Sequence, residues 1–248
     1  MNDQYLKLVE SIKKLDSVVV AFSGGVDSTL LLKACKDALD EKAIALTIDS
    51  PYIPNWEIDE AKDLAKSIGI RHEIIKLNEI PSIIKNNPYN RCYLCKKTLF
   101  TMMIERGKAL GYVNIISPLL ENKLTKEDIR EMSKVLNLPT WDKPAYACLL
   151  TRFPYDTYLE KKDISIVEKA EEYLMSLGFH GLRVRKHDQI ARIEISRHER
   201  KKLFNEDLLD NISDTIKAMG FNYVCFEASG YSSGSFDEEL SNKDEGNE

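Results

Sequence analysis

Residues 18–34, VVVAFSGGVDSTLLLKA, constrain the fold of this 248-residue chain more than any other stretch. An apolar run breaks into Ser-Gly-Gly and continues with apolar residues at helical spacing, which predicts a buried strand that runs into a helix. The N-terminus of such a helix carries unpaired N–H groups and a partial positive charge, so it binds anions well. Gly24 and Gly25 let the backbone approach a ligand closely. The stretch therefore predicts a phosphate site.

The first half of the chain alternates strand-like and helical patterns, with strands expected at 18–22, 43–48, 72–77 and 113–117. Gly69 is expected to end one of the helices, and Thr125, with Asp128 placed as in a capping box, to precede another. This order predicts an α/β fold with a parallel sheet, helices on both faces and ligands beyond the carboxyl ends of the strands. From about residue 155 the pattern changes to helices at 161–177 and 206–219 and strands at 182–187, 190–195 and 222–227. We expect an ATP-binding domain over 1–150, a small α+β domain over 151–230 and a flexible acidic tail over 231–248.

The charge balance gives little sign of a nucleic-acid partner. The net charge of −5 is that of residues 237–248 alone, which hold six acids and one lysine, so the body is close to neutral. Residues 180–202 carry eight Lys and Arg against three acids, which suits an anionic ligand or a solvated face equally. The apolar runs are too short for a membrane span and the N-terminus is charged. We expect a cytoplasmic protein with no membrane or nucleic-acid partner.

The phosphate loop has a recognisable form. It lacks the lysine of the Walker loop, and SGGVDS instead matches the PP-loop of the ATP pyrophosphatases. This resemblance implies that Ser23, Gly24, Gly25, Asp27 and Ser28 hold the pyrophosphate part of ATP with Mg²⁺ nearby. It also places the adenine and ribose at TIDS, with Thr47, Asp49 and Ser50.

Three of the five cysteines form a candidate metal site. Cys92 and Cys95 make a C-x-x-C pair, a spacing shared by zinc sites, redox dithiols and iron–sulfur clusters, and Cys148 stands alone. Three thiolates without an obvious fourth ligand suit a cubane cluster with one open iron, although a zinc site completed by a histidine remains the alternative. Cys35 and Cys225 lie in apolar patterns, so we expect both to be core thiols.

A family resemblance extends over residues 15 to 230. The PP-loop, NRCYLCKKTLF, LTKEDIREMSKVLNLPTWDKPAYACLLTRFPY and LRVRKHDQIARIEI occur in the order and wording of the LarE family. These sulfur transferases mature the nickel-pincer cofactor of lactate racemase. The resemblance implies an ATP-dependent, AMP- and pyrophosphate-forming enzyme that adenylates the carboxylates of a pyridinium mononucleotide and inserts sulfur. It also implies a homo-oligomer.

The resemblance assigns roles to individual residues. Cys148 takes the position of the family's sulfur-bearing cysteine, and together with Cys92 and Cys95 it indicates the type that binds a [4Fe–4S] cluster and receives sulfide from a sulfur donor. Asp27 and Glu194 are expected in the catalytic site. The remaining candidates contact the substrate: Arg183 and Arg185, which alternate on a strand and could clamp a phosphate, with Arg91 and Trp56 as weaker candidates.

One departure from the family keeps other functions open. Members of the family carry a GTNxDD-type segment and a following loop before the SPL strand. Here GKALGYVNIISPLL continues without that segment near residues 112–113, so the connection is roughly thirty residues shorter than in the family. An iron–sulfur-dependent tRNA thiolation enzyme is the main alternative, although such enzymes add basic modules or zinc ribbons that this sequence does not show. The other alternative is a non-catalytic nucleotide- or cluster-binding relative.

Overall fold

The computed structural model describes residues 3–116 and 124–231, and the chain forms two compact units. The first contains Met1–Pro81 and Cys92–Tyr146, and the second contains Ser82–Arg91 and Ala147–Glu248. The chain therefore passes between the units three times, because the short segment 82–91 belongs with the C-terminal half. The expected acidic tail lies, beyond Tyr231, outside the described residues.

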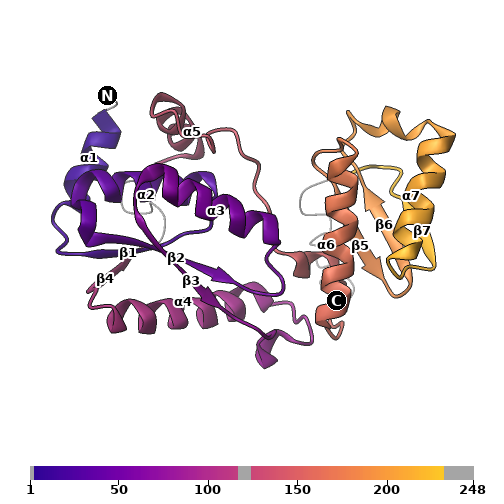
Figure 1. The fold of residues 1–248 in the computed structure, drawn as a ribbon, viewed down its shortest axis with the longest axis horizontal. Coiled ribbons are helices and arrows are strands. Elements are labelled where there is room, and N and C mark those ends of the chain that lie inside the picture. Colours follow the sequence, from indigo (N-terminus) through magenta and orange to yellow (C-terminus); the bar gives the residue numbers. More distant parts are fainter. Residues whose placement is uncertain (1–2, 117–123, 232–248) are drawn as a thin grey trace, which may run out of the picture. The chain divides into compact units, whose positions relative to one another are not determined.

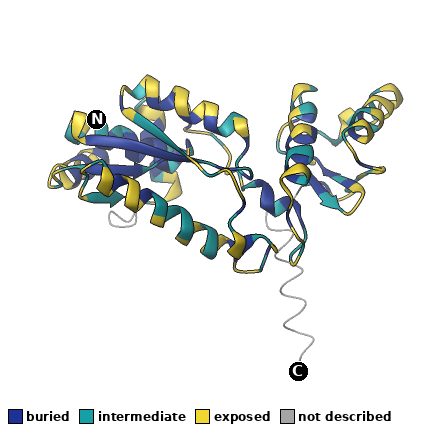
Figure 2. Cartoon of the chain, turned by 60° about the horizontal axis from the view of Figure 1, so that its bottom comes forward, coloured by how far each residue is buried: buried dark blue, intermediate teal, exposed yellow. Residues whose placement is uncertain are grey.

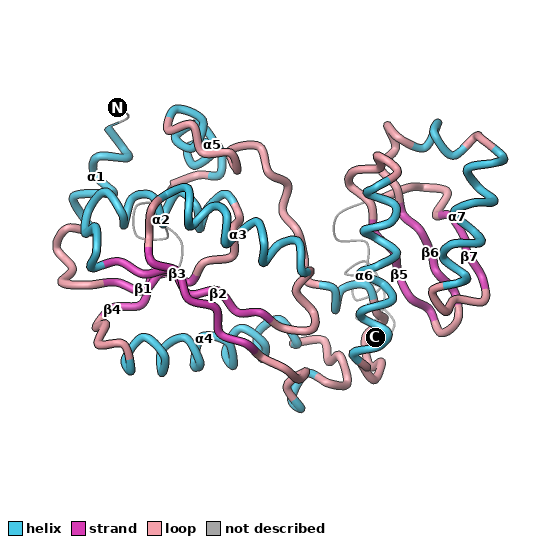
Figure 3. The backbone as a smooth tube through the Cα atoms, in the orientation of Figure 1, coloured by secondary structure: helices cyan, strands magenta, loops and turns pink. Residues whose placement is uncertain are grey.

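The first unit is built on a parallel sheet, as the sequence predicts (Figures 1 and 3). Its strand order is β3-β2-β1-β4, and each pairing is parallel. The strand order reverses at β1, with β2 and β3 on one side of it and β4 on the other. Such a topological switch point is where α/β sheets bind ligands. The strands are β1 (Val18–Ala21), β2 (Ala43–Asp49), β3 (Arg71–Lys76) and β4 (Asn114–Ile116).

Helices cover both faces of this sheet (Figure 1). Val18 and Val20 face one apolar core with α1, α2, α3 and α5, while Val19 faces the other with α4. Helix α4 packs so closely that a Cβ on Gly107 would lie 3.0 Å from Cγ2 of Val19. The helices are α1 (Asp3–Ile12), α2 (Val26–Leu39), α3 (Asn55–Ile68), α4 (Arg91–Ala109) and α5 (Lys126–Val135).

Two helix boundaries follow the expected end signals. Gly69 ends α3 with a left-handed φ of 74°. Thr125 begins α5 with a full capping box, in which its side chain accepts from the backbone N–H of Asp128 and the Asp128 carboxylate accepts from the backbone N–H of Thr125. The cap fixes the start of α5, and with it the position of the next residue, Lys126.

The second unit is a small α+β structure, again as predicted. Figure 2 shows its inward faces buried and its helices exposed on their outer sides. The sheet order is β5-β6-β7, with β5 antiparallel and β7 parallel to β6. Its elements are the short 3-10 helix η3 (Leu149–Arg152), then α6 (Lys161–Ser176), β5 (Arg183–His187), β6 (Ile190–Glu194), α7 (Glu206–Ala218) and β7 (Tyr223–Phe226).

Segment 82–91 is held in the second unit by backbone and side-chain hydrogen bonds. The Asn87 amide donates to the carbonyls of Phe153 and Pro154 at 3.1 and 2.7 Å. The backbone N–H of Leu159 donates to the carbonyl of Lys85 at 2.8 Å. Asn87 is fully buried and adopts a φ of 50°, which asparagine tolerates better than most residues. No helix in the described ranges is both long and apolar enough to cross a bilayer.

Candidate functional site

The SGGVDS loop forms the turn between β1 and α2. Gly24 adopts a φ of +69°, and a Cβ there would lie 3.4 Å from the backbone of Ala61, so a side chain would be strained and crowded. Gly25 is the N-cap of α2, and the Ser28 hydroxyl donates to its carbonyl at 3.1 Å. The hydroxyls of Ser23 and Ser28 lie 3.2 Å apart. The structure therefore brings the predicted loop residues together around the start of a helix, where N–H groups can bind phosphate.

A cavity of about 600 Å³ opens beside this loop, within the first unit. Its walls come from the PP-loop, from Thr47 and Ile48 of β2, from α4 and from residues 143–146. The basic side chains on its wall are Lys96, Lys126, Arg130 and Lys143, against the acids Asp27 and Glu57. The volume and the excess of positive charge suit a nucleoside triphosphate.

The three residues predicted to follow β2 differ in their placement. Thr47 lines the cavity, where its hydroxyl donates to the Phe22 carbonyl at 2.7 Å and lies 2.8 Å from Nε2 of His72. Asp49 and Ser50 are not among the residues that line it. Burial, and to a lesser degree the nearby Lys62, lowers the pKa of His72 below its ordinary value. Of the three predicted residues, Thr47 is thus the one that lines the cavity, beside Ile48 of the same strand.

Of the three lysines on the cavity wall, none was singled out from the sequence, and two of them contact residues of the loop. The Lys126 ammonium donates to Oδ1 of Asp27 at 2.6 Å and to Oδ2 at 2.5 Å. The Lys143 ammonium donates to the Gly24 carbonyl at 3.2 Å and to Glu60 at 2.6 Å. These contacts join residues 99 and 119 positions apart, so no local pattern marks them. The usable signal was that both lysines stand in stretches carrying the family resemblance.

Trp56 lies in the first turn of α3 in the same unit. Its ring makes an edge-on contact with Tyr146, with centroids 4.8 Å apart, and Nζ of Lys143 lies 5.9 Å from its centroid. Tyr146 and Lys143 both line the cavity, whereas Trp56 contacts them without being one of its lining residues.

The C-x-x-C pair lies in the first turn of α4, also in the first unit. Cys92 is exposed and Cys95 is partly buried. Burial raises the pKa of the Cys95 thiol, partly opposed by the hydroxyl of Tyr52, which lies 3.4 Å from its sulfur. Two thiols one helical turn apart provide donors that suit iron or zinc.

Cys148 belongs to the second unit, immediately before η3. Its thiol is partly buried, and its carbonyl accepts from Nη1 of Arg152 at 3.2 Å and from the Thr151 hydroxyl at 3.0 Å. Among residues 3–116 and 124–231, no group of three or more His, Cys, Asp and Glu side chains stands assembled to hold a metal.

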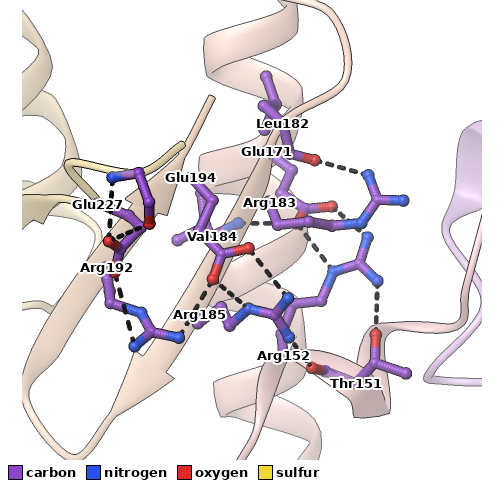
Figure 4. A network of polar contacts seen from close by, with 11 residues as sticks. Thr151, Arg152, Glu171, Leu182, Arg183, Val184, Arg185, Arg192, Glu194 and Glu227 are labelled. Atoms are coloured by element: carbon purple, nitrogen blue, oxygen red, sulfur yellow. Dashed lines mark hydrogen bonds and ion pairs between the residues drawn. The ribbon is translucent and has the colours of Figure 1, made fainter. Parts of the chain in front are cut away.

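The predicted substrate arginines of β5 lie in a buried polar network (Figure 4). Arg185 donates from Nε and Nη2 to Glu194 at 2.6 and 2.9 Å, and from Nη1 to the Thr151 carbonyl at 2.8 Å. Arg183 donates to the Leu182 carbonyl at 2.6 Å and lies 4.8 Å from the Tyr231 ring centroid. Glu194 also accepts from Arg192 at 3.1 Å. The structure thus joins Arg185 and Glu194 directly, as a buried ion pair.

A second buried pair supports the segment that contains Cys148. Arg152, fully buried, donates to both oxygens of Glu171 at 2.9 and 3.0 Å. Oε1 of Glu171 also accepts from the backbone N–H of Val184 at 2.9 Å. The pair therefore links η3, α6 and β5, and its two residues were not singled out from the sequence.

Arg91 stands at the end of segment 82–91, and its guanidinium lies 4.3 Å from the ring centroid of Tyr155. The side chain is buried, and its Nε and Nη1 atoms have no hydrogen-bond partner within the described ranges. A buried guanidinium of this kind is costly unless an anion satisfies it.

The two remaining cysteines differ from each other. Cys35 is fully buried, as expected, and burial raises the pKa of its thiol to about 12. The expectation for Cys225 is wrong, because this residue is exposed. β7 is an edge strand, and the alternation along it turns Tyr223 and Cys225 to the solvent.

A parallel sheet whose first strand runs through SGGVDS into the N-terminus of a helix defines a PP-loop ATP-dependent enzyme. In agreement, residues 3–102 match the model of the NAD synthase family. The chain is 31% identical, over 94% of its own length and 93% of the relative's, to the pyridinium-3,5-bisthiocarboxylic acid mononucleotide synthase of Lactiplantibacillus plantarum. The chain belongs to the LarE family.

Two further relatives also align over most of the length of both chains. An uncharacterised protein of Synechocystis is 36% identical over 89% of this chain and 92% of its own length. An uncharacterised protein of Methanocaldococcus jannaschii is 31% identical over 92% of this chain and 97% of its own. The alignment with the Lactiplantibacillus enzyme spans 261 positions but covers only 94% of 248 residues, which leaves about 28 positions without a counterpart here. This agrees with the shortened connection expected near 112–113, where only Leu110–Val113 separate α4 from β4.

Proposed function

We propose that the protein is an ATP-dependent sulfur transferase that converts a carboxylate of a pyridinium mononucleotide into a thiocarboxylate, in the manner of nickel-pincer cofactor synthesis. A single observation carries this proposal. The PP-loop and its basic cavity occur in a chain that is 31% identical, over nearly its full length, to an enzyme named for making such a bisthiocarboxylic acid mononucleotide.

The first step uses the cavity of the first unit. A carboxylate oxygen of the substrate attacks the α-phosphorus of ATP, the bond to the bridging oxygen breaks, and pyrophosphate leaves. Ser23, Gly24, Gly25 and Ser28 would hold the departing phosphates at the start of α2. The Asp27 carboxylate, at the cavity wall, is a donor that Mg²⁺ prefers. Thr47, Asp49 and Ser50 remain the proposed contacts to adenine and ribose.

In the second step, sulfide attacks the acyl carbon of the adenylate and AMP leaves. We propose Cys92, Cys95 and Cys148 as ligands of a [4Fe–4S] cluster, which when bound supplies an iron with a free coordination position for sulfide. The thiol chemistry fits, and two of the three donors share one helical turn. The sulfide comes from a donor that the chain itself does not specify.

The arginines of the second unit are the proposed contacts to the phosphate and carboxylates of the substrate. Arg91 offers buried N–H groups without a protein partner in the described ranges, and Arg183 is the second candidate. Because Glu194 accepts two hydrogen bonds from Arg185, we propose that it orients this guanidinium. Trp56 is the proposed contact from the first unit.

Anaerobically purified protein tests the proposal. We expect iron and sulfide near four each per chain, a brown cluster spectrum, and pyrophosphate release that requires the pyridinium biscarboxylate mononucleotide. Cys148 should keep its mass through repeated turnovers when sulfide is supplied. Stoichiometric zinc without iron would contradict the cluster. A Cys148 lighter by the mass of hydrogen sulfide after a single turnover would instead show that the cysteine is the sulfur donor. Formation of thiolated tRNA would show that the substrate is tRNA and not the mononucleotide.

A further inference from the structure

Lys126 contacts the PP-loop itself, through the carboxylate of Asp27. Its ammonium lies within 2.6 Å of both carboxylate oxygens of Asp27, and both residues line the cavity. The capping box of Thr125 and Asp128 fixes the helix start from which this side chain extends. A lysine held in this way occupies the carboxylate that a divalent cation would need.

Two other cations of the cavity wall hold different groups. Lys143 binds Glu60 and the Gly24 carbonyl, and Arg130 donates to the carbonyls of Trp141 and Lys143 at 2.7 and 3.0 Å. Of these three, Lys126 alone contacts the acidic side chain of the SGGVDS loop. Its ammonium therefore offsets the negative charge that Asp27 would otherwise present to a ligand.

The exposure of the pair decides whether it can open. The side chains of Lys126 and Asp27 are 52% and 33% exposed. An exposed ion pair of this kind contributes only about 0.2–1 kcal/mol, so a stronger partner can replace it. A divalent cation for the carboxylate and a phosphate oxygen for the ammonium are both stronger partners.

We propose that Lys126 exchanges partners during binding: it neutralises Asp27 before the nucleotide arrives, and it turns to a β- or γ-phosphate oxygen once Mg²⁺ takes the carboxylate. The pair thereby weakens binding of the metal ion alone and favours its binding together with the triphosphate. When pyrophosphate leaves, the same ammonium stabilises the negative charge on it. This inference rests on the proposed use of Mg·ATP at the PP-loop.

The test compares Lys126→Met, Lys126→Arg and a matched control, Lys62→Met, in the full chain. Lys62 is also an exposed lysine that pairs with a carboxylate, Asp59 at 2.7 Å, but it does not line the cavity. The first probe is Mn²⁺ alone, followed by electron paramagnetic resonance. We expect Lys126→Met to bind Mn²⁺ about two- to fivefold more tightly than the wild type, the range that loss of an exposed pair allows. Lys126→Arg and Lys62→Met should bind it like the wild type.

The second probe is a magnesium complex of a non-hydrolysable ATP analogue, measured by calorimetry. Lys126→Met should bind it roughly tenfold more weakly, because a charge-assisted hydrogen bond to phosphate is lost. In the double variant Asp27→Asn/Lys126→Met the gain in Mn²⁺ affinity should disappear, which ties the gain to this carboxylate. Unchanged or weaker Mn²⁺ binding by Lys126→Met overturns the inference. A wild type that does not bind the nucleotide overturns the proposed function, and the Mn²⁺ comparison still decides the role of Lys126.

Discussion

The two units use charged side chains in opposite ways. At the PP-loop of the first unit, Asp27 and Lys126 are both partly exposed and line a cavity. In the second unit, the pairs Arg152–Glu171 and Arg185–Glu194 have side chains no more than 6% exposed (Figure 4). An exposed pair is weak and can exchange its partner, whereas opening a buried pair leaves an unpaired charge in a dry environment. The first arrangement is open to a ligand, and the second holds its side chains in fixed positions.

The sharpest way to separate the two is to remove a carboxylate from the exposed site. Asp27→Ala should abolish pyrophosphate release, because the carboxylate proposed to bind Mg²⁺ is lost, while the free energy of unfolding changes by less than about 1 kcal/mol. Release of pyrophosphate and urea unfolding of the same preparations measure the two effects. Ser28→Ala is expected to behave alike. Undiminished turnover in both variants would remove the PP-loop from the reaction.

The opposite result is expected for the buried network. Glu171→Gln leaves the fully buried Arg152 without its carboxylate, which should lower the free energy of unfolding by about 3–5 kcal/mol. Asp59→Asn breaks an exposed pair with Lys62 and serves as control, with an expected loss below about 1 kcal/mol. Urea denaturation compares them. Equal losses in the two variants would show that burial does not distinguish the pairs.

For the two cysteines outside the proposed cluster the order is reversed: Cys35, in the first unit, is buried, and Cys225, in the second unit, is exposed. Cys35→Ala removes a fully buried sulfur and should cost about 1 kcal/mol of stability. Cys225→Ala alters an exposed position and should stay within about 0.5 kcal/mol. In the folded protein, a thiol reagent should modify Cys225 and spare Cys35. A Cys225 that resists the reagent would contradict its exposure.

The smallest effect is expected from His72, a partly buried polar group beneath the cavity. Its pKa is lowered in the folded state, chiefly by burial, whereas in the unfolded chain it lies near 6.5. As the pH falls below about 6.5, the unfolded chain therefore binds a proton that the folded chain does not, and His72 makes stability decrease. Urea midpoints between pH 5 and 7 should fall more steeply for the wild type than for His72→Gln. Parallel curves would exclude a contribution from this side chain.

The sequence was sufficient where local pattern decides structure. VVVAF followed by SGG predicted the end of β1 and the start of α2, and Gly69 and Thr125 marked helix ends that the structure confirms. The seven expected strands all form, with ends shifted by a residue or two. These elements depend on periodicity, capping and glycine conformation, which act over a few neighbouring residues.

What could not be predicted depends on contacts between distant residues. Lys126 reaches Asp27 across 99 positions, and Arg152 pairs with Glu171 only because η3 packs on α6. Cys225 was misplaced because all four residues of β7 are apolar, so the pattern does not show that Tyr223 and Cys225 lie on the exposed face of the sheet. The ion pair of Arg185 with Glu194 was not expected either, because it follows from the register of β5 and β6, which sets Arg185 opposite Arg192 and within reach of Glu194. Tertiary pairing, absent from local pattern, decides all four.

Segment 82–91 has a consequence for synthesis on the ribosome. Asn87 binds the carbonyl of Phe153, which lies 66 residues later in the chain. At about 5–20 residues per second, these partners leave the ribosome roughly 3–13 s after the segment itself. During that interval the first unit can complete its sheet with β4, but the second unit lacks the residues that hold segment 82–91. The order of translation therefore lets the nucleotide-binding unit fold first, and segment 82–91 packs into the second unit afterwards.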